Sequence, residues 1–295
     1  MTMLFGVPLA VLYGQLLLGL INGAFYALLS LGLAVIFGLL KIINFAHGAL
    51  YMLGALCAVV LLDTLGVNYW VALFVSPILV GIFGIILERF LLRRIAHEDH
   101  IYSLLLTFGI ALVIQGVFTN IYGVSGMRYA IPDALKGGVN LGFMFLPYYR
   151  AWVIVAALVV CFGTWFMIEK TKLGSYLRAG TENAPLMQAF GINVPLLVTL
   201  TYGFGVMLAA FAGVLAAPIY SVTPVMGANI LIIVFAVVVI GGMGSIIGAV
   251  LTGLAMGIIE GLTKVFYPEA STTVIFLVMV IVLLLRPAGL FGKEA

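Results

Sequence analysis

Charged residues are scarce in this sequence: Asp, Glu, Lys and Arg make up only 8% of the 295 residues, whereas 65% are hydrophobic. Soluble globular domains carry roughly a quarter of their residues as these four types. The scarcity excludes a water-soluble protein and places most of the chain in a lipid bilayer. The net charge is +3, and the basic residues stand at the ends of apolar runs, where membrane proteins carry them to set their orientation. No nucleic-acid partner is therefore expected.

Several chemical features are also missing. The two cysteines, Cys57 and Cys161, lie inside apolar runs without pairing or metal-ligand spacing, which predicts buried free thiols. The first nine residues lack the basic start and the cleavage site of a secretory signal peptide, so we expect the first apolar run to remain as an anchor. No segment matches the phosphate-binding loop G-x-x-x-x-G-K-[ST]. The sequence therefore predicts no cofactor, and an ATP-driven process would need a separate ATPase subunit.

Long apolar runs dominate what is present. They fall at about 9–40, 48–65, 70–92, 101–122, 151–169, 193–217, 228–265 and 271–286. A helix of roughly 20 residues crosses the hydrocarbon core, and backbone groups there must bond within their own segment unless a barrel closes. These runs are continuous rather than alternating, which favours helices. The predicted fold is an all-α, polytopic transmembrane bundle forming a single domain over residues 1–295, with about eight to ten membrane segments including broken or short helices.

Two of the runs are too long for one span. Residues 228–265 contain Gly241, Gly242, Met243, Gly244 and Ser245, which predict a helix end followed by a new N-cap. Residues 9–40 offer weaker break points at Asn22-Gly23 and Ser30-Leu31-Gly32, so one tilted helix and two joined segments both remain open. Small residues such as Gly248 and Gly253 are expected to allow close helix packing.

Lys and Arg collect on one side of the expected membrane. Arg93 and Arg94 precede one loop, Lys170, Lys172 and Arg178 line a second, and Arg286 and Lys293 mark the tail. Short loops rich in these residues stay in the cytoplasm. We therefore expect the loops at 93–100 and 170–192, the C-terminus and the glycine break to face the cytoplasm, while the side of the N-terminus stays open.

The segment at 171–193 holds a predicted short helix on the cytoplasmic side. Glu182 and Asn183 precede it, Pro185 suits its first turn, and Gly191 suits a left-handed position after its end. Leu186 and Phe190 share one face at i, i+4. Such a helix either lies on lipid or inserts into a groove of a partner protein, and its shortness and lack of basic residues favour the partner.

Polar residues inside the runs are few. We take Glu260 as the only acidic residue that could serve ion-coupled transport; it stands close to the end of its run, and an ion pair with Lys264 is the preferred interpretation. Asn44 and His47 stand at a junction between runs, where they could cap helix ends or line a passage, and capping is favoured. This inventory argues against proton or sodium coupling.

The loop at 123–150 is long enough to be a folded cap or docking surface on the outer side. It contains Pro132, Asp133 and the aromatic pair Tyr148 and Tyr149. An ordered interfacial loop with tyrosines at the level of the lipid headgroups is an equally good interpretation.

Several separated motifs resemble one known family, the inner-membrane permeases of branched-chain amino-acid ABC importers of the LivH type. The similarity runs through nearly the whole chain. It is carried by Ile43-Asn-Phe-Ala-His-Gly48 with Tyr51-Met-Leu-Gly54, by the loop from Leu173 to Asn193, by Pro218, Pro224 and Gly227, by residues 235–250, and by Arg286-Pro-Ala-Gly-Leu-Phe-Gly292.

The resemblance implies a multi-pass protein of the bacterial inner membrane that imports branched-chain amino acids by alternating access and is not an enzyme. It implies four kinds of partner: a second homologous permease chain in a heterodimer, two cytoplasmic ATPase subunits, a periplasmic substrate-binding protein and membrane lipid. The binding protein would dock on residues 123–150 and 218–229. The residues expected to contact the ATPase are Arg178, Glu182, Pro185, Phe190 and Gly191, although Glu182-Asn-Ala-Pro185 departs from the acidic residue and adjacent alanines common in such loops.

A substrate pathway is expected to include Asn44, His47, Gly241, Gly242, Gly244 and Ser245. The family also includes transporters for urea, short amides and other small acids, so these remain alternative substrates. A self-sufficient channel or facilitator is the rival from a different functional class.

Overall fold

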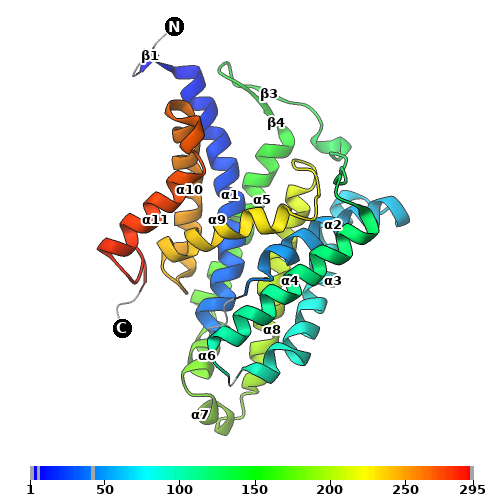
Figure 1. Ribbon diagram of the computed structural model, residues 1–295, viewed down its shortest axis with the longest axis vertical. Coiled ribbons are helices and arrows are strands. Elements are labelled where there is room, and N and C mark those ends of the chain that lie inside the picture. Colours follow the sequence, from blue (N-terminus) through cyan, green and yellow to red (C-terminus); the bar gives the residue numbers. More distant parts are fainter. Residues whose placement is uncertain (1–2, 5–6, 41–43, 97, 293–295) are drawn as a thin grey trace. The chain divides into compact units, whose positions relative to one another are not determined.

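The computed structural model describes residues 3–4, 7–40, 44–96 and 98–292 (Figure 1). Ile43 of the first motif and Lys293 of the tail lie outside the described residues. The long helices are α1 (Leu9–Leu40), α2 (His47–Leu65), α3 (Tyr69–Phe90), α4 (His100–Tyr122), α5 (Tyr148–Lys170), α8 (Val194–Ala216) and α10 (Ile246–Phe266). The shorter ones are α6 (Lys172–Glu182), α7 (Ala184–Ala189), α9 (Met226–Gly241) and α11 (Thr273–Leu285), and three 3-10 turns are η1 (Leu92–Ile95), η2 (Asp133–Leu135) and η3 (Pro268–Ala270).

The strands form two small antiparallel hairpins. β1 (Met3–Leu4) pairs with β2 (Val7–Pro8), and β3 (Gly138–Asn140) pairs with β4 (Phe145–Pro147) with Val139 opposite Leu146. Everything else regular within the described part is helical. The all-α prediction is therefore confirmed.

Seven of the described helices are long and apolar enough to cross a membrane, and α9 and α11 are two shorter apolar helices. The predicted eight to ten segments included short helices, and that number stays a prediction. The chain is a multi-pass membrane protein. The open question about the first run is answered by α1, which continues through Asn22 and Gly23 as one helix of 32 residues.

The chain divides into two compact units, which are described separately. The first unit holds residues 1–30, 131–161 and 233–295, and the second holds residues 31–130 and 162–232. Helices α1, α5 and α9 each contribute residues to both units.

In the second unit, α8 packs along both α2 and α3, and α4 lies against α2 and η1. Glycines set the distance between these helices. A Cβ atom on Gly54 would lie 2.3 Å from the carbonyl oxygen of Ala210, and one on Gly213 would lie 2.0 Å from that of Tyr51. Lipid tails give helices no hydrophobic reason to associate, so close backbone contact of this kind supplies the packing energy.

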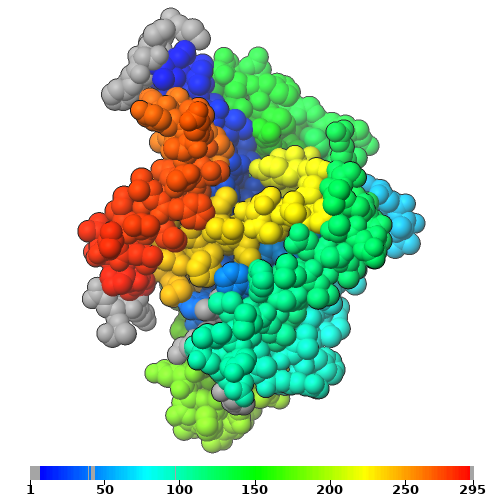
Figure 2. Space-filling model, viewed as in Figure 1, coloured from blue at the N-terminus to red at the C-terminus, as the bar shows by residue number. Residues whose placement is uncertain are grey.

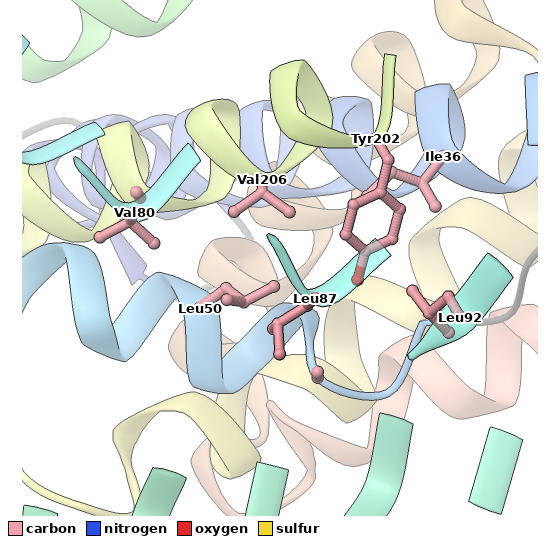
Figure 3. Close-up of a cluster of buried hydrophobic side chains, with 9 residues drawn as sticks. Ile36, Leu50, Val80, Leu87, Leu92, Tyr202 and Val206 are labelled. Carbon is pink, nitrogen blue, oxygen red and sulfur yellow. The ribbon is translucent and has the colours of Figure 1, made fainter. Parts of the chain in front are cut away.

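A cluster of buried apolar side chains fills the space between these helices (Figure 3). Tyr202 and Val206 of α8 meet Leu50 of α2, and Leu87 of α3 lies close by with Leu92 of η1. Ile36 in the last turns of α1 completes the cluster. The cluster fixes the end of α3 and the first half of α8 within one body.

In the first unit, the same principle joins α1 to α10. A Cβ atom on Gly19 would lie 2.5 Å from the carbonyl oxygen of Gly257, and one on Gly253 would lie 2.4 Å from the backbone nitrogen of Ala27. The expectation that glycines of the 228–265 run allow close packing is confirmed. Helix α10 also contacts α11.

We predict that Gly54→Ala destabilises the protein by about 1–3 kcal/mol, because the new methyl group would collide with the backbone of α8. Gly116→Ala is the matched control, since nothing lies within 4 Å of a Cβ atom there on the exposed face of α4. It should be neutral or stabilise α4 by up to ~1 kcal/mol. Thermal unfolding of the detergent-solubilised variants measures both effects. Equal melting temperatures for the two variants would contradict the proposed packing of α2 on α8.

Candidate functional site

The segment at 171–193 forms two consecutive short helices, α6 and α7, followed at once by α8. In Figure 2 its lime-green residues project beyond the teal residues of α4, which belong to the same unit. The prediction of a helix that begins after Asn183 is confirmed for α7. Helix α6 was not predicted: Arg178 and Glu182 lie within this second helix and not in a loop before α7.

Helix α6 was missed because its packing depends on glycines, which locally disfavour a helix. Thr171 caps its start by accepting a hydrogen bond from the Leu173 backbone N–H at 3.3 Å. Gly174 lies directly against the backbone of Ile168 near the end of α5, where no Cβ atom would fit. Arg178 holds the same two helices together through an ion pair with Glu169 at 3.6 Å. Helix α6 is therefore anchored to the end of α5.

The ends of α7 are fixed by local side chains, as the sequence predicted. The Asn183 side chain accepts a hydrogen bond from the Leu186 backbone N–H at 3.1 Å, and Pro185 lies in the first turn. Gly191 adopts φ = +83°, a left-handed conformation that favours glycine. Asn193 then caps α8 by accepting a hydrogen bond from the Leu196 backbone N–H at 3.1 Å. Only four residues separate α7 from α8, so a movement of α7 would pull directly on the start of α8.

Helix α7 presents its apolar residues outward. Phe190 is 74% exposed and Leu186 is 52% exposed, and no residue of α7 is buried. All five residues predicted to contact an ATPase, Arg178, Glu182, Pro185, Phe190 and Gly191, are exposed on this one segment. An exposed aromatic residue at the end of a short capped helix is suited to insertion into a groove of a partner.

The glycine break between α9 and α10 has the predicted geometry. Gly242 and Gly244 have φ values of +98° and +96°, and the Ser245 side chain accepts a hydrogen bond from the Gly248 backbone N–H at 3.0 Å. Ser245 is thus the N-cap of α10, as expected.

The break also receives the end of the chain, which the sequence did not indicate. The Leu290 and Phe291 backbone N–H groups donate to the carbonyl oxygens of Ile240 and Gly241 at 2.8 Å and 3.1 Å. A Cβ atom on Gly242 would lie 2.4 Å from the backbone nitrogen of Gly292. The positive-φ glycines at the break and in the tail therefore allow two backbone segments to pack tightly, which gives Gly241 and Gly242 a structural role.

Asn44 and His47 are both 1% exposed in the second unit. The Asn44 side chain accepts a hydrogen bond from the Ala46 backbone N–H at 3.1 Å, and the His47 ring packs against Gly32 of α1 at the start of α2. The Asn44 bond goes to Ala46, the residue before α2, and this residue provides no side-chain cap for the first turn of α2, so the capping role of Asn44 and His47 stays a prediction. The other predicted pathway residues lie in the first unit: Gly241, Gly242, Gly244 and Ser245.

Glu260 forms the predicted ion pair, with Lys264 Nζ at 2.5 Å from its Oε1 atom. It also accepts a hydrogen bond from the Tyr26 hydroxyl of α1 at 2.7 Å. A second acidic residue inside a membrane run, Glu88 in α3, is also buried, at 2% exposure, and the sequence reasoning did not consider it. Its position inside the 70–92 run was a signal that could have identified it.

Glu88 lies in a polar cluster between α3 and α8. The Thr199 hydroxyl donates to Glu88 Oε2 at 2.6 Å, and Arg93 Nε lies 3.6 Å from Glu88 Oε1. Arg93 Nη2 donates to the Pro195 carbonyl oxygen at 2.8 Å and to Thr199 Oγ1 at 3.0 Å. These four residues join the end of α3 to the first two turns of α8.

The predicted docking segments meet in the second unit. Met127 and Val222 exchange two backbone hydrogen bonds, at 2.9 Å and 2.8 Å, so the loop after α4 is tied to the connection after α8. In the first unit, Tyr148 is exposed but Tyr149 is only 1% exposed, so Tyr149 packs inward instead of reaching lipid headgroups. Asp133 is exposed, and its pKa is lowered by a hydrogen bond and ion pair with Lys136.

Comparison with known proteins follows this geometry. Residues 15–283 match the family described as branched-chain amino acid transport system, permease component. The chain is 32% identical over 95% of both lengths to the high-affinity branched-chain amino acid transport system permease protein BraD of Pseudomonas aeruginosa. It is 28% identical, over 95% of both lengths, to the high-affinity permease protein LivH of Escherichia coli. It is 27% identical, over 97% of this chain and 91% of the relative, to a probable LivH protein of Methanocaldococcus jannaschii. No solved structure matches the chain.

We predict that Gly242→Ala weakens the attachment of the tail to the glycine break. It adds both backbone strain and a collision with Gly292, whereas the control Gly142→Ala adds strain alone, because Gly142 has φ = +82° and open space around it. The strain should cost about 1–2 kcal/mol in each variant. Gly242→Ala should therefore lower the melting temperature further than Gly142→Ala. Equal losses would show that the tail does not pack on the break as described.

Proposed function

Because the chain belongs to the family of permease components of branched-chain amino acid transport systems, we propose that it is a transmembrane subunit of an importer for branched-chain amino acids in a bacterial inner membrane. The observation that carries this proposal is the family match over residues 15–283. The seven described helices that are long and apolar enough to cross a membrane support it, since such a subunit needs a bundle that encloses a passage. The subunit provides a pathway and performs no covalent chemistry.

Energy for import is proposed to come from two separate ATPase subunits. The chain has no phosphate-binding loop, so its contribution is to receive movement from a partner. Helix α7 is the proposed receiving element, because Phe190 and Leu186 are exposed there and α8 follows within a few residues. Arg178, Glu182, Pro185 and Gly191 would border the same contact. This assignment puts α6, α7 and the C-terminal tail on the cytoplasmic side, in agreement with the basic residues near them.

Two further partners complete the proposed assembly. A second, homologous permease chain would form the pore with this one, and a periplasmic binding protein would deliver the amino acid. The paired segments at Met127 and Val222 are the proposed docking surface for the binding protein, because a backbone bridge holds them in one place. ATP binding would draw the ATPases together and open the pathway to one side at a time.

The proposed pathway elements are the start of α2, with Asn44 and His47, and the break formed by Gly241, Gly242, Gly244 and Ser245. Their close packing means that they would act by placing helix ends beside the passage rather than by providing open space. The scarcity of charge in the membrane helices fits a cargo with an apolar side chain.

We predict that Phe190→Asp greatly reduces copurification of the permease with its ATPase subunits. A charge would replace the exposed aromatic residue that the partner buries, and loss of such an anchor costs about 2 kcal/mol, which is on the order of tenfold or more in affinity. Copurification from membranes that coexpress all subunits measures the effect.

Leu65→Asp is the matched control, because Leu65 is also an apolar residue at a helix end and is 71% exposed, but it is the last residue of α2, next to the turn that leads into α3. It should retain the ATPase. If Phe190→Asp copurifies as well as the wild type and Leu65→Asp do, then α7 is not the contact.

A further inference from the structure

A buried charged cluster connects the segment after α7 to a second membrane helix. Its members are Glu88 of α3, Arg93 of η1, and Pro195 and Thr199 of α8. The side chain of Glu88 is 3% exposed and that of Arg93 is 40% exposed. Burying a carboxylate is costly unless it is paired and hydrogen-bonded. The cost of retaining Glu88 here requires a reason beyond simple helix packing.

The apolar contacts between α3 and α8 do not require a charge. Gly84 of α3 lies against Val206, where a Cβ atom would be 2.8 Å from a methyl group, and a Cβ atom on Gly81 would lie 2.2 Å from Met207 Cγ. These contacts are apolar, and they hold the two helices together without a charge. A directional cluster can fix register, because its hydrogen bonds are made in only one alignment.

The position of the cluster is as informative as its chemistry. Arg93 reaches the carbonyl oxygen of Pro195, which lies in the first turn of α8, and the Thr199 hydroxyl one turn later donates to Glu88. That first turn is separated from α7 only by the four residues 190–193. The cluster therefore bonds to the first two turns of α8. A displacement of α7 would reach these turns before the rest of α8.

We propose that Glu88, Thr199 and Arg93 form a clamp that makes α3 move together with α8 when α7 is displaced. This proposal rests on the proposed function, in which α7 receives movement from the ATPase. The three are positioning residues, because they act by holding two helices in register and not by contacting the cargo. Without the clamp, α8 would shift along α3 and part of the movement would be lost before it reached the pathway.

Thr199→Val tests the clamp with the least disturbance. Valine keeps the shape of threonine but removes the hydroxyl of α8 that donates to Glu88 and accepts from Arg93. Thr199→Ser restores the hydroxyl and should rescue the function. Thr119→Val in α4 is the matched control, because the hydrogen bond recorded for the Thr119 hydroxyl goes to Gln115 of its own helix.

The measurement is leucine imported per ATP hydrolysed by the complete complex, reconstituted in lipid vesicles with its ATPase subunits and binding protein. We expect Thr199→Val to keep ATP hydrolysis within about twofold of wild type while leucine uptake falls on the order of tenfold. Thr199→Ser and Thr119→Val should keep the wild-type ratio. A merely structural role would lower uptake and hydrolysis together through loss of assembled complex.

A second measurement follows the helices themselves. Spin labels are placed at Ile86→Cys in α3 and Leu200→Cys in α8, both exposed positions, with Cys57→Ala and Cys161→Ala removing the native thiols. The distance between the labels should stay constant between resting and nucleotide-trapped complexes with an intact clamp, and should change or broaden with Thr199→Val.

The outcomes separate the clamp from the proposed function. A wild-type complex that neither hydrolyses ATP nor imports leucine would reject the importer and the clamp with it. A working wild-type complex in which Thr199→Val imports as much leucine per ATP as wild type would overturn the clamp alone. A wild-type distance between α3 and α8 that changes on nucleotide trapping would also overturn it.

Discussion

Close backbone contact through glycine is the constraint on which both units depend. Helices in lipid gain nothing from hiding apolar side chains that lipid would solvate equally well, so they need dispersion contacts at short range. Gly54 and Gly213 provide these contacts between α2 and α8, and Gly19 and Gly257 do so between α1 and α10. The same kind of contact lets the tail pack against the break between α9 and α10, where Gly242 meets Gly292. The many glycines of the chain are thus structural parts, and they allow tightly fitted bodies that move as units.

Buried charge is the exception within this apolar framework. The carboxylates of Glu88 and Glu260 are both stabilised by an ion pair and a hydrogen bond. Glu260 is neutralised by Lys264 one turn later and bonded by Tyr26 from α1. Glu88 is paired with Arg93 after the end of its helix and bonded by Thr199 from α8. Each carboxylate joins two helices within one unit. Glu88 differs because one of its helices begins immediately after α7, which links a structural device to the proposed transmission of force.

Local signals in the sequence predicted local structure correctly. The cap at Asn183, the left-handed Gly191 and the new start at Ser245 all depend on residues within four positions of each other, so the sequence contains the whole interaction. The contacts that were missed join distant residues: Glu88 with Thr199, the tail with the break, and Gly174 of α6 with the end of α5. Glycine within a helix has no local signature of what packs against it, and α6 was missed for that reason. The predicted ATPase contacts remain predictions, although the structure exposes all five.

The most direct test of the central claim is uptake of radiolabelled leucine into lipid vesicles. Vesicles that contain both permease chains, the ATPase subunits and the binding protein are compared with vesicles that contain the permease chains alone. Leucine should accumulate only in the complete complex and only with ATP, because the permease depends on movement from its partners. Leucine that equilibrates through the permease chains alone, without ATP, would contradict this account and identify a facilitator.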